Sequence, residues 1–276
     1  MDYKLLDEHL EFIQPYLIKW FREYNILMLE ADYKIYKYEV LDGFINNPRT
    51  LICQGYINSI KNAFKEMIKS YYYSVSANLI EKELLKEGQE WSGYWKYEIK
   101  NYYCRNLIPQ FFSILDYIAV MINELSKQQL ITKIYLVNFK KIKHELSKYI
   151  KNDYVGWLTN NDIRKINTLI QCAYLNITDE EKEVLKPYRN KAIHRYLIGI
   201  DEILVNTHRK ELTNKDKKMF QVNQGHKYSV KFKPEYNFNQ LIIIIEKLIN
   251  NLDLMISELM RLDIMKEVIK VKEPTS

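Results

Sequence analysis

Turn-forming residues are scarce in this sequence, which contains only seven Gly and six Pro among its 276 residues. Gly and Pro are the strongest interrupters of regular structure, so their scarcity disfavours a sheet of many short strands and favours long helices. The composition is otherwise that of a globular protein, 47% hydrophobic and 28% charged, which excludes a disordered chain. We therefore expect an all-α fold.

Cysteine is also sparse, and its three copies, Cys53, Cys104 and Cys172, form no CxxC pair. This excludes a disulfide framework and a zinc knuckle, and we expect no metal site. The N-terminus is acidic, unlike a signal peptide. The apolar run at 241–245 is much shorter than the roughly 20 residues that span a membrane. The sequence predicts a reduced, cytoplasmic protein without a membrane partner.

Apolar residues recur at helical spacing along most of the chain. The predicted helices cover residues 2–30, 51–73, 76–86, 91–124 with a bend near Pro109, 137–151 and 160–174, and a last helix starts near 234–237 and runs to about 270. Thr178 and Glu181 form a capping-box pattern that predicts a helix start near residue 179. Pro187 is expected to kink or restart this helix, and a restart over 187–198 agrees with Gly199 just past its end.

One segment has the alternation of strands. Residues 220–222 and 228–232 flank Asn223-Gln224-Gly225, which predicts a β-hairpin near 219–232. The expected fold is thus a multi-helix bundle with one small hairpin insertion. Residues 1–90 are predicted to be an N-terminal helical extension, either a separate module or part of the same bundle, and 91–276 the main helical domain. The wide apolar surface of the last helix predicts a central position or a contact with a second subunit.

Positive charge is concentrated between residues 207 and 233. This segment holds eight Lys or Arg and two acidic residues, so its charge of +6 equals that of the whole chain. Such a stretch suits a polyanionic partner, with Lys215, Lys217 and Lys218 as candidate RNA contacts. The alternative is a solvated, lysine-rich loop.

The segment 186–196 holds the strongest chemical signal, Arg189-Asn190 followed by His194. Cleaving RNA without a metal requires removing a proton from a 2′-hydroxyl, stabilising a charged phosphorane and protonating the leaving 5′-oxygen. Histidine titrates near neutrality and can serve either proton transfer. Arginine offers a permanently charged donor fork for phosphate oxygens. In a helix that begins at Pro187, Arg189 would lie in the first turn, where free N–H groups favour an anion.

Helix geometry constrains how these three side chains can meet. Asn190 and His194 are about 40° apart around an ideal helix and share a face, whereas Arg189 and His194 are about 140° apart. A long Arg side chain, a distorted turn or two protomers that pool their residues would close this gap. Asn190 would then fix the imidazole tautomer or contact the phosphate.

The run Arg189-Asn190-Lys191-Ala192-Ile193-His194 resembles the Arg-polar-x3-His signature of the HEPN superfamily, over about eight residues. The resemblance implies a helical-bundle, metal-independent and cofactor-free endoribonuclease of toxin–antitoxin or abortive-infection systems. It implies Arg189, Asn190 and His194 as catalytic residues, a homodimer, and products with a cyclic or 3′ phosphate and a 5′-hydroxyl. Lys191 and Arg195 are candidate RNA contacts within the motif.

Tyr196 extends the match to Arg-x4-His-x-Tyr. This form resembles members whose tyrosine is adenylylated by a nucleotidyltransferase antitoxin, which implies a possible modification site and a possible antitoxin partner. The alternative is that Tyr196 serves only in packing.

Structural roles are open for the other motif residues as well. His194 could be a packed histidine bonded to a carbonyl, and Arg189 could pair with Glu181 or Glu183. The alternative function is a non-catalytic HEPN-like module that binds RNA or a protein partner, and a purely structural scaffold is a third possibility.

Overall fold

The computed structural model describes residues 11, 14–15, 48–88, 93–148, 154–193, 198–202, 207–230 and 234–265. The predicted helix over 2–30, apart from residues 11, 14 and 15, lies outside the described residues, as does the chain beyond residue 265.

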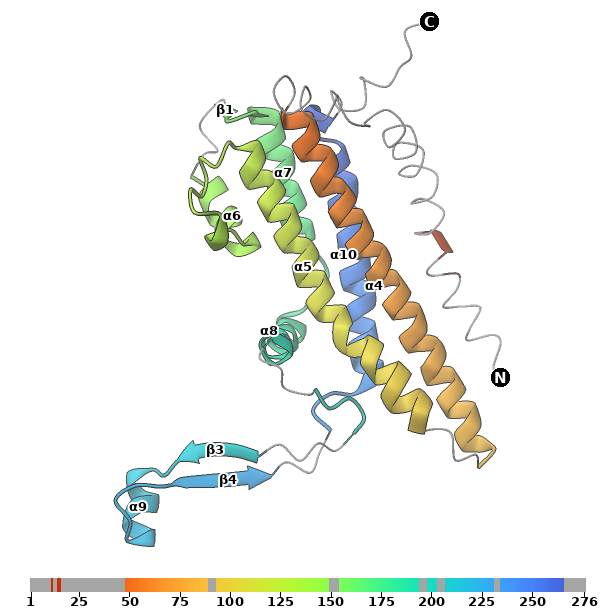
Figure 1. The fold of residues 1–276 in the computed structure, drawn as a ribbon, viewed down its shortest axis with the longest axis vertical. Coiled ribbons are helices and arrows are strands. Elements are labelled where there is room, and N and C mark those ends of the chain that lie inside the picture. The colour runs from red at the N-terminus through yellow and green to blue at the C-terminus, as the bar shows by residue number, and fades with distance from the viewer. Residues whose placement is uncertain are drawn as a thin grey trace, which may run out of the picture.

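The described chain is mostly helical, which confirms the all-α class, and carries two small antiparallel strand pairs (Figure 1). The helical elements are α4 (Pro48–Lys86), the π-helix η2 (Tyr94–Asn101), α5 (Tyr102–Leu125), the 3-10 turn η3 (Ile134–Leu136), α6 (Phe139–Leu146), α7 (Asn160–Cys172), α8 (Asp179–Ile193), α9 (Asn214–Phe220) and α10 (Phe238–Met260). The strands are β1 (Tyr154–Val155), β2 (Leu158–Thr159), β3 (Thr207–Glu211) and β4 (His226–Val230).

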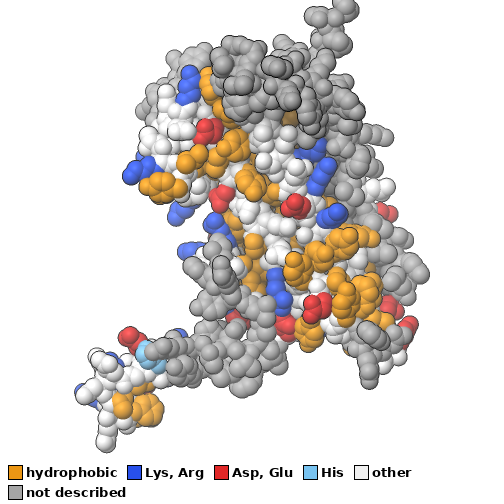
Figure 2. Space-filling view, viewed as in Figure 1, with side chains coloured by type: hydrophobic (Ala, Val, Ile, Leu, Met, Phe, Trp, Pro, Cys, Tyr) orange, Lys and Arg blue, Asp and Glu red, His pale blue; other side chains and the backbone are white. Residues whose placement is uncertain are grey.

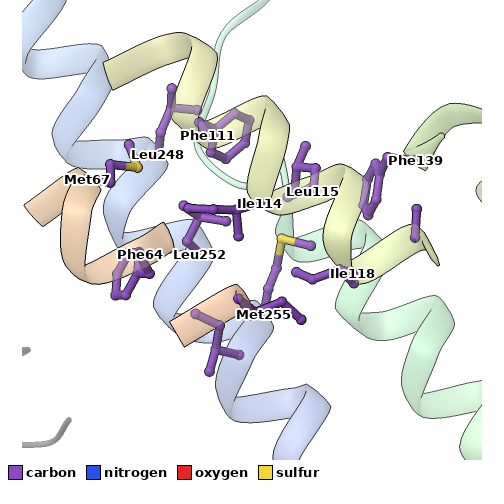
Figure 3. Packing of buried hydrophobic residues seen from close by; sticks show 14 of the residues in the cluster. Phe64, Met67, Phe111, Ile114, Leu115, Ile118, Phe139, Leu248, Leu252 and Met255 are labelled. Atoms are coloured by element: carbon purple, nitrogen blue, oxygen red, sulfur yellow. The ribbon is translucent and has the colours of Figure 1, made fainter. Parts of the chain in front are cut away.

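Helices α4, α5, α7 and α10 form the long bundle seen in Figure 1. Their facing sides are apolar, and Figure 3 shows side chains from α4, α5, α6 and α10 interdigitating in one core. On α10 this core includes Leu248, Leu252 and Met255, all fully buried. Each such burial contributes about 1.5–3 kcal/mol. The predicted central position of the last helix is therefore confirmed over Phe238–Met260.

The core runs across residue 90 of the chain. Phe64 and Met67 on α4 pack with Ile114 on α5 (Figure 3). The buried hydroxyl of Tyr71 donates to Glu246 on α10 at 2.5 Å. Burial, together with this bond, raises the pKa of the Tyr71 phenol. Residues 48–86, predicted as two helices, are one continuous helix within the bundle.

Helix α8 corrects the predicted restart at Pro187. The capping box is present, since Glu181 N–H donates to the Thr178 hydroxyl at 3.2 Å and Thr178 N–H to the Glu181 carboxylate at 2.9 Å. The helix then runs through Pro187 to Ile193 without a break. Leu185 and Tyr188, on either side of Pro187, are buried, and their packing offsets the hydrogen bond that the Pro removes. Arg189 therefore does not lie in a first turn, and the argument from free helix N–H groups is wrong.

The predicted hairpin near 219–232 is correct for one strand and wrong for the other. β4 pairs with β3 in the antiparallel register Thr207↔Val230 to Glu211↔His226, and residues 214–220 between them form α9. The reason is a capping box: Thr213 N–H donates to Asp216 at 2.9 Å, and Asp216 N–H donates to the Thr213 hydroxyl at 3.3 Å. These bonds begin a helix that ends at Phe220, so the segment 220–222 is the end of a helix and not a strand.

A second strand pair, β1–β2, closes one end of the bundle at Gly156. Gly156 has a φ of +64°, and a Cβ there would lie 2.3 Å from the carbonyl carbon of Ser126. Trp157 N–H donates to the Leu125 carbonyl at 2.9 Å. Gly at position 156 thus permits the close approach that fixes this pair to the end of α5.

Candidate ribonuclease site on helix α8

The buried side of α8 sets the orientation of the motif residues. Leu185 and Tyr188 are buried, and Val184 and Ala192 pack partly against the core. Residues at this spacing of three and four form the side of α8 that faces α5. Asn190 lies exposed.

Arg189 lies where α8 meets α5. Its Nη2 atom lies 3.4 Å from Oδ2 of Asp116, and both side chains are 37% exposed. The guanidinium carbon lies 4.6 Å from the ring centroid of Phe112. An ion pair this open to water contributes only about 0–1 kcal/mol. A phosphate can therefore compete for the guanidinium, which has five N–H donors.

Asp116 is itself fixed. Its Oδ1 accepts a hydrogen bond from the N–H of Phe139, the first residue of α6, at 3.2 Å. The alternative partner Glu181 pairs instead with Lys247 on α10 at 2.7 Å. Arg189 thus pairs with a carboxylate on α5, whereas the alternative interpretation of the sequence placed its partner on its own helix.

Tyr174 belongs to the same electrostatic neighbourhood. Burial raises the pKa of its phenol, the positive charge of Arg189 opposes this rise, and the negative charge of Asp116 adds to it. The phenol therefore stays protonated at neutral pH and offers a hydroxyl beside the ion pair.

Lys191 is engaged with residues that precede α10. It forms an ion pair with Glu235, and its Nζ lies 5.9 Å from the ring centroid of Tyr236. The ring of Tyr236 lies 4.9 Å from that of Tyr188, whose hydroxyl donates to the Cys104 carbonyl at 3.4 Å. The charge of Lys191 is thus neutralised by Glu235.

His194, Arg195 and Tyr196 lie outside the described residues. The chain is described again from Ile198, whose carbonyl accepts a hydrogen bond from Arg105 Nε at 2.8 Å. Arg105 also pairs with Glu202, and Asn101 Nδ2 donates to the Ile200 carbonyl at 3.0 Å. Residues 198–202 are therefore held by side chains of η2 and α5.

The structure separates the predicted RNA contacts into two places. Lys215, Lys217 and Lys218 lie on α9, which Figure 1 shows at the end of the β3–β4 hairpin, away from α8, the helix that carries Arg189.

Sequence reasoning missed Asp116 and Phe112, which are far from Arg189 along the chain. One local signal was present, because the two are four residues apart and so share a face of α5. That spacing indicates a charged residue beside an aromatic ring on a mostly apolar helix, but it does not show that Arg189 is the residue that contacts them.

No protein-family model, curated protein or solved structure matches this chain. Among the described residues, no three His, Cys, Asp or Glu side chains gather as a metal site requires. None of the helices in the described part of the chain has both the length and the apolar character to cross a membrane. The assignment of function therefore depends on the chemistry around α8.

Proposed function

We propose that the chain is a metal-independent endoribonuclease of the HEPN type that acts in defence or growth arrest. The observation that carries the proposal is Arg189 itself, a half-exposed guanidinium held by Phe112 and by a weak ion pair with Asp116. It lies on the helix that also presents the exposed Asn190, and His194 follows Asn190 by four residues in the sequence.

The proposed reaction uses the side chains of Arg189 and His194 together with solvent water. The 2′-oxygen attacks the adjacent phosphorus as its proton leaves, the bond from phosphorus to the 5′-oxygen breaks, and that oxygen takes up a proton. The imidazole of His194 serves one of the two proton transfers, and solvent water serves the other. Arg189 stabilises the charge that gathers on the phosphorane oxygens. The products are a 2′,3′-cyclic phosphate and a 5′-hydroxyl.

The test is cleavage of end-labelled single-stranded RNA in EDTA by the wild-type protein and by Arg189→Ala and His194→Ala. We expect each substitution to abolish cleavage and to leave the helical circular dichroism spectrum unchanged. Matched controls are Arg164→Ala and His144→Ala, which remove the same side chains at exposed positions on α7 and α6. Full activity in either motif variant, or equal loss in its control, would exclude the site.

The second candidate is a non-catalytic HEPN-like module that binds RNA or a protein. It is favoured by the lysines of α9, since no carboxylate among the described residues pairs with Lys215, Lys217 or Lys218. In that case the same assay would show RNA retained by the protein in a salt-dependent manner, without new ends.

A further inference from the structure

The β3–α9–β4 segment, residues 207–230, projects from the bundle and is called the arm (Figure 1). Its strands pair over five residues, from Thr207↔Val230 to Glu211↔His226. At about 3.4 Å per residue, the paired strands are about 17 Å long. The arm thus carries α9 well away from the bundle.

The end of the arm is a defined structure. Asp216 caps α9 through Thr213 and also pairs with Lys227 on β4 at 2.9 Å. Hydrogen bonds from Thr213 and then from Lys227 lower the pKa of Asp216 to about 2. Gln221, which follows the last residue of α9, has the left-handed conformation, and Val222 N–H donates to the Lys217 carbonyl at 3.0 Å. These bonds define the backbone conformation at both ends of α9.

Three apolar side chains are exposed on this end. Met219 is 71%, Phe220 56% and Val222 40% exposed. Figure 2 shows hydrophobic side chains gathered near the end of the arm, beside Lys or Arg. Exposed apolar residues that cluster in this way are typical of a surface that contacts a partner.

A shallow concavity lies beside them. Two lysines, three amide side chains and one valine line it: Asn214, Lys217, Lys218, Gln221, Val222 and Asn223. Amides carry both hydrogen-bond donors and acceptors, as base edges require, and lysines suit phosphates. Insertion of this end into the hydrocarbon of a lipid bilayer would instead leave these amides without partners, which is costly.

The charge of the arm favours a polyanionic partner. The arm has six basic and two acidic residues, a net charge of +4, whereas the rest of the chain has 35 basic and 33 acidic residues. A second copy of this chain therefore offers the arm a body with a small positive net charge, which does not attract it. A nucleic acid offers a continuous row of negative charges.

We propose that the end of the arm binds single-stranded RNA, with a base stacked on Phe220 and phosphates on Lys217 and Lys218. The inference deepens the proposed function and rests on it for the identity of the ligand. Stacking on an aromatic ring tolerates any base, so the arm confers affinity for unpaired RNA without a sequence requirement. The substrate class that follows is a long, unpaired RNA that reaches both the arm and Arg189.

The test is the affinity of a fluorescein-labelled 15-nucleotide unstructured RNA for full-length His194→Ala protein, measured by anisotropy. Phe220→Ala in this background should weaken binding about 5- to 100-fold, because it removes one stacked base. Phe220→Trp should preserve binding. The matched control is Met219→Ala, which removes a neighbouring exposed apolar side chain without a ring and should change the affinity less than about threefold.

Replacing both Lys217 and Lys218 by Gln should reduce the slope of log K against log salt by about 1.4, since each phosphate that is no longer neutralised accounts for about 0.7. Equal weakening of binding by Phe220→Ala and Met219→Ala, an unchanged slope, or no RNA binding by the parent protein would overturn the inference. So would binding to phosphatidylserine vesicles that both apolar substitutions abolish, which would identify a membrane surface.

Cleavage separates this inference from the proposed function. If the wild-type protein makes no new RNA ends while Phe220→Ala still weakens binding, the proposed ribonuclease activity is wrong and RNA binding by the arm is supported. If RNA is cleaved but Phe220→Ala binds it with the affinity of its parent, the ribonuclease activity is supported and RNA binding by the arm is wrong.

Discussion

Arg189 has two unlike neighbours, the ring of Phe112 and the carboxylate of Asp116. The ring can hold the guanidinium in place without neutralising its charge. The carboxylate also orients the guanidinium, but it competes with a phosphate for the same N–H donors. If the proposed function is correct, Asp116 is a positioning residue that acts on RNA only through Arg189.

Asp116→Asn tests this role, because it keeps an oxygen for the Phe139 N–H and removes the charge. We expect kcat for RNA cleavage to fall about 10- to 100-fold as Arg189 loses its fixed position. The KM should stay constant or fall, since a negative charge near the phosphate has gone. Steady-state kinetics measure both, with Glu180→Gln, an exposed acid on the same helix as Arg189, as the control. A rise in KM with constant kcat would contradict the role.

The sequence predicted Arg189 as a site residue but not its surroundings, and the reason is physical. Arg189 and Asn190 were recognisable because their chemistry and spacing are local. Asp116 lies 73 residues before Arg189 in the chain, and only the packing of α8 on α5 brings the two together.

At the scale of elements, helices were predictable where periodicity and caps agreed. The Thr178–Glu181 capping box is confirmed. The partner of β4 was not predictable, because strand pairing is non-local and Thr213–Asp216 forms a cap between the strands. The sequence also did not predict that α8 continues through Pro187, because the burial of Leu185 and Tyr188 outweighs the tendency of Pro187 to break a helix.

Two glycines allow a matched test of these packing arguments. Gly156→Ala should destabilise the protein by about 2–5 kcal/mol, because of the clash with Ser126 and the positive φ. Gly55→Ala, inside α4 with nothing within 4 Å of the added Cβ, should stabilise it by about 0.5–1 kcal/mol. Urea unfolding followed by circular dichroism measures both. Similar free energies of unfolding for the two variants would show that the β1–β2 contact with α5 is wrongly described.

At the scale of the whole molecule, the predicted homodimer would let Arg189 of one subunit act with His194 of the other. Complementation tests this arrangement. Each variant, Arg189→Ala or His194→Ala, should be inactive alone. Mixed and re-equilibrated in equal amounts, they should recover about a quarter of wild-type activity, because half of the dimers then hold one intact composite site.

Sedimentation equilibrium of the same samples gives the oligomeric state. Dimers without recovered activity would indicate that each subunit keeps its own Arg and His together. A monomer at micromolar concentration with full wild-type activity would exclude the dimer.

The two chain segments that lead into and out of the arm are hydrogen-bonded to each other. Asp201 N–H donates to the Tyr236 carbonyl at 3.0 Å, and Tyr236 N–H donates to the Gly199 carbonyl at 3.1 Å. Because the two ends of the insertion already meet there, residues between them can be lengthened, shortened or exchanged without opening the core. Over evolutionary time, selection can therefore change which ligand the protein binds by changing the residues of the arm, while the helices of the bundle stay the same.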